Sequence, residues 1–258
     1  AHVMSAAMNA DLIQYLLRLG DSAMVQAQRL CQWCGRAPAL EEELALMNVG
    51  LDLVGQARNW LEYAAELADD GRDADHLVFR RDERAYRNLL LVEQPNGDYA
   101  MTILKQFFYD AWHFAVLQGL CRSGDERVQG IAAKALKEVT YHLRRSGEWV
   151  ERLGDGTEHS RQRMLAALPQ VWRFTVELVD ADAVEQRLFQ AGLIGNPEQV
   201  ALDWQHQVEA TFERACLPVP QPASHFYLSG RQGVHSEHLG LLLAEMQFLP
   251  RAYPDATW

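Results

Sequence analysis

Hydrophobic residues recur every three or four positions along most of this chain, the spacing that gathers them on one face of an α-helix. No stretch shows the sustained alternation that is typical of a β-strand. Turn-forming clusters such as Pro95-Asn96-Gly97 and Gly195-Asn196-Pro197 separate the periodic segments. The pattern predicts helices over residues 9–34, 39–69, 98–120, 126–153, 160–180, 182–191, 197–216 and 235–249, the first of them open to a break near Gly20 and Asp21.

These elements predict an all-α fold, a helical bundle with additional helices, formed as a single domain over residues 9–258. Residues 1–8, which begin with AHVM, are expected to be an expression remnant or a disordered start. The Pro- and Gly-rich stretch 217–234 is expected to be an ordered excursion on the surface.

Each of the four long helices has an apolar stripe that is interrupted near its middle by polar residues. Residues at this spacing lie on one side of a helix, so we expect the polar groups of all four stripes to share one interior. The interrupting residues are Gln26 in the first helix, Gln56 in the second, Gln106, Asp110 and His113 in the third, and His142 and Ser146 in the fourth.

The positions of these polar residues match those of metal ligands in di-iron four-helix bundles. Such bundles use one Glu from each of two helices and a Glu-x-x-His pair from each of the other two. Here the two pairs are Leu53 with Gln56 and Val139 with His142, and the single positions are Gln26 and Asp110. Leucine and valine cannot bind a metal, so one carboxylate and one imidazole remain of the full set.

The sequence therefore predicts vestigial metal positions, with no catalytic residue, metal or other cofactor in this chain. The plainer interpretation is that these are ordinary buried polar groups that bond to one another. A buried carboxylate needs a partner, and for Asp110 we expect Lys134, His113 or Gln26.

The helix at 39–69 carries a second apolar line on another face. A helix that is apolar on two sides is buried on two sides. It is then either central to a large monomer or in contact with another subunit, and Leu44, Met47 and Leu51 are the candidate partner contacts. The full line consists of Leu40, Leu44, Met47, Leu51, Val54 and Leu61.

Composition narrows the classes of partner. The chain has 258 residues, 48% of them hydrophobic, and a formal net charge of -11 with its basic residues dispersed, which argues against nucleic acid and against an anionic membrane surface. No apolar run approaches the roughly 20 residues that span a bilayer, and we expect a cytoplasmic protein.

The four cysteines are Cys31, Cys34, Cys121 and Cys216. The Cys-x-x-Cys spacing of the first two suits zinc or redox chemistry, but no second close pair completes a zinc site. No strand precedes the pair, as a thioredoxin-like motif requires, so we expect reduced thiols.

Four segments resemble one known family, the structural, non-catalytic subunits of bacterial phenylacetyl-CoA 1,2-epoxidases, called PaaC. The similarity covers nearly the whole chain from about residue 9, and the VEQPNG and HSEHLG stretches are its specific parts. The segments are LALMNVGLDLVGQARNWLEYAAELA, RDERAYRNLLLVEQPNGDYAMTILKQFFYDAWHFAVL, AAKALKEVTYHLRRSGEWVERLGDGT and GRQGVHSEHLGLLLAEMQFLPR.

This resemblance implies a ferritin-like fold and a role beside a catalytic subunit that carries the di-iron centre. That complex uses molecular oxygen, and electrons from a reductase subunit, to epoxidise the ring of phenylacetyl-CoA. The chain is then expected to be catalytically inactive by itself. The reductase and small subunits are further expected partners, and self-association stays open.

Two other functions are compatible with the residues. One is a helical metalloprotein with a non-standard site, built either from His142 with Asp110 and Glu138 or from His235 and His238 with Glu237 and Glu245. The other is a generic helical scaffold. A basic run with interleaved acids could also meet the phosphates of CoA, although a solvated helix face explains it equally; it consists of Arg80, Arg81, Arg84 and Arg87.

Overall fold

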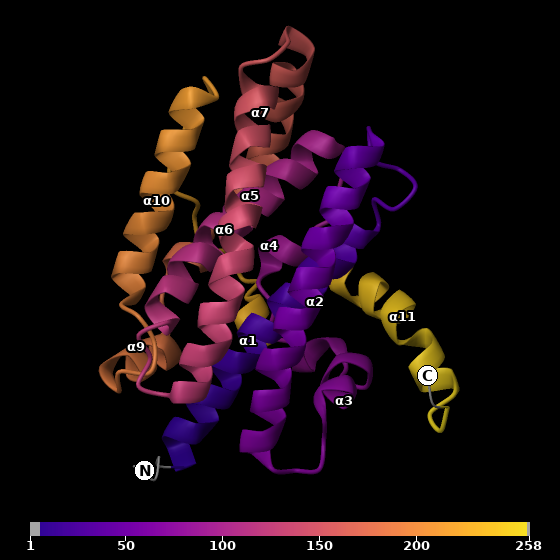
Figure 1. Cartoon of the computed structure of the whole chain (residues 1–258), viewed down its shortest axis with the longest axis vertical. Coiled ribbons are helices and arrows are strands. Elements are labelled where there is room, and N and C mark those ends of the chain that lie inside the picture. The colour runs from indigo at the N-terminus through magenta and orange to yellow at the C-terminus, as the bar shows by residue number, and fades with distance from the viewer. Residues whose placement is uncertain (1–5, 257–258) are drawn as a thin grey trace.

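Four long helices form the body of the molecule, which the computed structural model describes over residues 6–256. Helix α1 (Ala6–Cys31) packs along α2 (Leu40–Ala68), and α5 (Tyr99–Leu120) packs along α6 (Glu126–Gly154). Figure 1 shows these helices running side by side through the centre of the molecule. Over the described residues the remaining regular structure is also helical, apart from one isolated bridge between Ser229 and Val234. The all-α prediction is confirmed.

Side-chain caps set the starts of two of the long helices close to where the turn residues predict them. The Asp98 carboxylate accepts a hydrogen bond from the Met101 N–H, and Asp125 accepts from the N–H groups of Arg127 and Val128. These bonds satisfy backbone donors that have no partner within the first turn of a helix.

Helix α1 is continuous, so the expected break near Gly20 and Asp21 is wrong. A Cβ on Gly20 would lie 2.6 Å from Cγ of Leu61 on α2, which shows that the glycine serves the close approach of the two helices. The helix also begins at Ala6, so residues 6–8 are helical and not a disordered start. Residues 1–5 lie outside the described part of the chain.

Shorter helices surround this body. Helices α7 (Glu158–Trp172) and α10 (Pro197–Arg214) pack against α5, and α9 (Ala183–Gln190) packs against α1. Helix α11 (Glu237–Ala252) projects from the side of the bundle in Figure 1 and contacts α3 (Ala74–Phe79), α4 (Leu90–Glu93) and the 3₁₀ turn η1 (Glu83–Ala85). The remaining elements are α8 (Val176–Val179) and the 3₁₀ turn η2 (Gly230–Gln232).

The single helix expected over 160–180 is in fact two. Helix α7 ends at Trp172, whose carbonyl accepts from the Thr175 hydroxyl at 2.8 Å and from the Thr175 N–H at 3.0 Å. Local hydroxyl bonding of this kind competes with helix continuation. Within residues 6–256, no helix combines the length and the apolar character that crossing a membrane requires.

Candidate functional site

The six positions predicted to be vestigial metal ligands all lie in the interior of the four-helix body. Gln26 comes from α1, Leu53 and Gln56 from α2, Asp110 from α5, and Val139 and His142 from α6. Their exposed fractions are 0%, 1%, 2%, 1%, 0% and 0% in that order. The side chains that the stripes singled out therefore occupy the interior of the same bundle.

Asp110 is held by a serine on the facing helix. The Ser146 hydroxyl donates to Asp110 Oδ2 at 2.8 Å. Burial raises the pKa of Asp110 to about 6, although the charge of His142 and the Ser146 hydrogen bond act in the opposite direction. Lys134, His113 and Gln26 were the expected partners, and within the described chain none of them bonds to this carboxylate. A neutral hydroxyl donor takes their place at Oδ2, and Oδ1 is buried without a hydrogen-bond partner in the described structure.

His142 and Gln56 take partners from just outside the metal pattern. His142 Nε2 lies 2.9 Å from Asp52 Oδ2, and Gln56 Nε2 donates to Glu138 Oε2 at 2.7 Å. Asp52 and Glu138 are the two bonding partners that lie outside the stripes, although Glu138 was already named in the mononuclear alternative. Each stands four residues before one of the two stripe residues, and that spacing was the available signal.

The mononuclear alternative built on His142, Asp110 and Glu138 is not supported by these contacts. The three side chains bond to Asp52, Ser146 and Gln56 respectively, and so face three different partners. Within residues 6–256, no group of three His, Cys, Asp or Glu side chains is placed to share one metal ion.

The donor set in the interior does not fit a di-metal centre. Leu53 and Val139 put hydrocarbon where two carboxylates would stand, and a hydrocarbon side chain has no electron pair to give to a metal. Four carboxylates normally offset the charge of two metal ions. Asp110 is the single carboxylate among the six positions.

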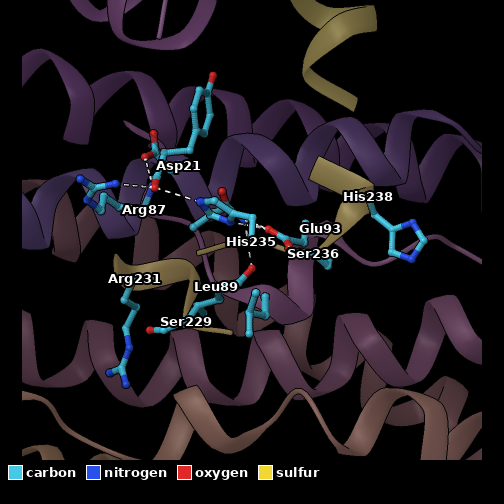
Figure 2. A network of polar contacts seen from close by, with 12 residues as sticks. Asp21, Arg87, Leu89, Glu93, Ser229, Arg231, His235, Ser236 and His238 are labelled. Carbon is cyan, nitrogen blue, oxygen red and sulfur yellow. Dashed lines mark hydrogen bonds and ion pairs between the residues drawn. The ribbon is translucent and has the colours of Figure 1, made fainter. Parts of the chain in front are cut away.

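A second polar network joins the two sequence stretches that carry the resemblance (Figure 2). The Glu93 carboxylate, fully buried on α4, accepts from Ser236 N–H at 2.7 Å, from the Ser236 hydroxyl at 2.7 Å and from Asn88 Nδ2 at 2.9 Å. His235 Nδ1 lies 2.7 Å from the same carboxylate. Glu93 thus binds the VEQPNG stretch to the segment that leads into α11.

His235 is a buried cation in this network. Its Nδ1 faces the Glu93 carboxylate and its Nε2 lies 3.0 Å from the Tyr86 carbonyl oxygen, so both ring nitrogens face acceptors. Burial opposes the charge, but the hydrogen bond to Glu93 and the Glu93 charge outweigh it and raise the pKa of His235 above its ordinary value.

The alternative metal site from His235 and His238 with Glu237 and Glu245 is therefore not supported. His235 Nδ1 and Nε2 are taken by Glu93 and Tyr86. His238 points away from Glu93 and His235 in Figure 2. Its Nε2 lies 3.8 Å from Glu237 Oε1 near the surface. The physical reason is that α11 begins only at Glu237, so His235 precedes the helix and the two imidazoles do not share a helix face.

The irregular segment before α4 is fixed by side chains from distant helices. The N–H groups of Arg87, Leu89 and Leu90 donate to side-chain oxygens over 2.8–3.0 Å. The acceptors, in the same order, are Asp21 and Ser22 of α1 and Glu177 of α8. Backbone donors that lack helix or sheet partners are thus satisfied individually.

Two residues of the basic run, Arg81 and Arg87, bond within the protein and are not free to meet a ligand. Arg81 is buried against Asp21, and Arg87 Nε donates to Gln14 at 3.1 Å. Both residues lie in irregular backbone and not on a helix, so the solvated-helix interpretation is wrong for these two. The end of the expected surface excursion is also internal, because Gly230 and Arg231 are buried.

The outer face of α2 is the main apolar surface that the sequence predicted. Leu40, Leu44, Leu51 and Val54 are exposed by 68%, 57%, 68% and 36%. Met47 is half-buried against the core, and Leu61 is completely buried. Leu61 therefore belongs to the core and not to this line, which otherwise lies open. We call Leu40, Leu44, Leu51 and Val54 the α2 outer face.

Fold and interior together define a class: an all-α bundle in which the hydrocarbon of Leu53 and Val139 stands beside buried polar groups, at the positions that the stripes compared with metal ligands. A family model described as phenylacetic acid catabolic protein matches residues 1–258. The chain is 52% identical over 248 residues to the C subunit of the 1,2-phenylacetyl-CoA epoxidase of Escherichia coli strain K12, covering 96% of this chain and 99% of that protein. The chain belongs to the phenylacetic acid catabolic protein family, which confirms the resemblance and agrees with a ferritin-like bundle.

Proposed function

We propose that this chain is a non-catalytic structural subunit of a multicomponent epoxidase that acts on phenylacetyl-CoA. The observation that supports the proposal is the interior of the bundle, where Leu53 and Val139 are buried at the positions that the stripe pattern equates with metal ligands. The similarity to a named phenylacetyl-CoA epoxidase component supports the substrate class. Chemistry would then take place in a second subunit, which holds the di-iron centre, while this chain holds no metal and no other cofactor.

The α2 outer face is the proposed contact with that catalytic subunit. Four apolar side chains in line on one helix form a surface that water solvates poorly, and burial of such side chains contributes about 1.5–3 kcal/mol each. Leu44 and Leu51 lie on this face, while Met47 is half-buried and packs against the core. The reductase and small subunits are proposed as further partners in a cytoplasmic complex.

The test has two arms, because the metal and the partner are separate claims. The first is metal analysis of the chain purified alone and with its catalytic subunit. We expect iron only in the complex; one or two stoichiometric transition metal ions in the isolated chain would overturn the proposal.

The second arm measures binding and epoxidation of phenylacetyl-CoA with Leu44→Asp and Leu51→Asp. Both positions are exposed in the chain, so fold is retained, while a buried charge at the contact weakens binding by several kcal/mol. The matched control is Leu202→Asp on α10, exposed by 49%, which should bind like the wild type. Equal turnover by the catalytic subunit with this chain omitted would refute the structural role.

A further inference from the structure

The CQWC segment takes no part in the sites described so far. Cys31 is the last residue of α1, and the backbone beyond it changes from α-helical hydrogen bonds to bonds that span three residues. The Trp33 N–H donates to the Leu30 carbonyl at 3.0 Å, and the Cys34 N–H donates to the Cys31 carbonyl at 3.1 Å. Both bonds span three residues, which is the pattern of a 3₁₀ turn.

This geometry brings the two cysteines into register. In a 3₁₀ turn the chain advances about 2.0 Å per residue, and side chains three positions apart are eclipsed, so the Cα atoms of Cys31 and Cys34 are about 6 Å apart on the same side. Disulfides join Cα atoms about 4.4–6.8 Å apart. The turn supplies the required spacing without any strand or thioredoxin-like fold.

The pair is accessible from solvent. Both cysteines line one surface hollow of about 560 Å³, together with Arg36, Asn96 and Glu245. Cys34 is exposed and Cys31 is half-buried. A Cβ on Gly50 of α2 would lie 3.0 Å from Cys31 Sγ, so the inner thiol rests against the α2 backbone.

The two thiols are therefore unequal. Burial, with a smaller contribution from Cys34, raises the pKa of the Cys31 thiol. The thiolate is the reactive form of cysteine, and exposure governs access to it. Cys34 is consequently the first to react, and Cys31 is the neighbouring thiol that can resolve the product.

We propose that Cys31 and Cys34 form a redox-active dithiol that a peroxide oxidant closes into a disulfide across this turn. The Cys34 thiolate attacks a peroxide oxygen; the S–O bond forms, the O–O bond breaks, and one water leaves after protonation. The Cys31 sulfur then attacks the Cys34 sulfenic acid; the S–S bond forms, the S–O bond breaks, and the Cys31 proton leaves in a second water. Two thiols lose two electrons and hydrogen peroxide gains them. The proposal is independent of the function proposed above.

The decisive experiment uses the wild-type chain, fully reduced and then treated with stoichiometric hydrogen peroxide. We expect the intact mass to fall by two hydrogens, a peptide with a Cys31–Cys34 disulfide, and reversal by dithiothreitol. Oxygen addition at Cys34 without loss of hydrogen, or a disulfide between other cysteines, would overturn the proposal.

Variants and a second probe separate the two roles. Cys31→Ser should stop at a sulfenic acid on Cys34 that a cyclic-diketone reagent traps, and Cys34→Ser should slow oxidation at residue 31 by roughly tenfold or more. Phenylarsine oxide, which bridges two thiols, should bind the wild type one to one and neither variant. Cys216→Ser is the matched control, since Cys216 is exposed without a second cysteine nearby in sequence, and it should behave as wild type. Equal arsenical binding by either single variant would contradict the pair.

Discussion

Replacing Glu93 with alanine tests the polar network that joins α4 to the start of α11. The substitution removes the acceptor of four donor groups on three residues: Asn88 Nδ2, the N–H and hydroxyl of Ser236, and His235 Nδ1. It leaves a buried imidazolium without its counter-ion. Removing one partner of a buried ion pair costs about 3–5 kcal/mol. Each orphaned neutral donor by itself costs about 1–3 kcal/mol, but these terms overlap and do not add.

We therefore expect Glu93→Ala to lower the free energy of unfolding by about 3–5 kcal/mol. Domains are stable by about 5–15 kcal/mol, so the variant should still fold. At about 2–4 °C per kcal/mol for a chain near this size, the midpoint of thermal unfolding should fall by about 6–20 °C. Urea unfolding followed by far-UV circular dichroism gives the first quantity and a thermal melt the second.

The matched control is Glu62→Ala. Glu62 pairs with Arg58 across one helical turn on the surface, where such pairs contribute about 0.3–0.5 kcal/mol. If Glu93→Ala costs less than about 1 kcal/mol, or no more than this control, then the network does not hold the C-terminal segment and the reasoning fails.

Three further results are expected. The stability advantage of wild type over His235→Gln should be complete below pH 6.5, the ordinary pKa of histidine, and should shrink as the pH rises. The reason is that a group whose pKa is higher in the folded than in the unfolded state stabilises the fold only while it is protonated. An advantage that grows between pH 6.5 and 9 in urea unfolding contradicts this. Asp110→Asn should be neutral or should stabilise the fold by about 1–3 kcal/mol at pH 7.5. Folding raises the pKa of Asp110 from 3.8 to about 6, so the folded state disfavours the ionised carboxyl at pH values above about 6. Clear destabilisation in the same assay would show that the charge itself is needed. Gly230→Ala should expose the C-terminal segment to limited proteolysis, because its Cβ would lie 2.0 Å from the Asn88 carbonyl oxygen. The control Gly130→Ala on α6 meets nothing within 4 Å and should raise the free energy of unfolding by about 0.5–1 kcal/mol. Equal cleavage of both variants would speak against the close approach.

The long helices and the interior positions could be predicted from the sequence because both follow from local periodicity. Stripes spaced by three and four were enough to place Gln26, Gln56, Asp110 and His142 in the bundle interior. The same spacing marked the outer face of α2. It failed at Leu61, which is buried, and in part at Met47, which is half-buried against the core, because one helical line can pass from an exposed to a buried stretch.

The contacts between distant segments could not be predicted in this way. Glu93 and His235 are 142 residues apart, and nothing in the local pattern around either residue names the other. The spacing of His235 and His238 suggested a shared helix face, but it depended on a helix start that the structure places two residues later. Asp110 found a neutral hydroxyl, whereas charge balance alone had favoured other partners.

The pairing of Glu93 with His235 also constrains the order in which the chain can fold during synthesis. Glu93 is synthesised long before His235, so its carboxylate lacks this counter-ion while nearly all of the bundle is made. Closing so long a loop is slow relative to forming the α1–α2 hairpin. Chains that stop short of residue 235 would lack the His235 and Ser236 donors, so the Glu93 network is completed only when the C-terminal segment has been made.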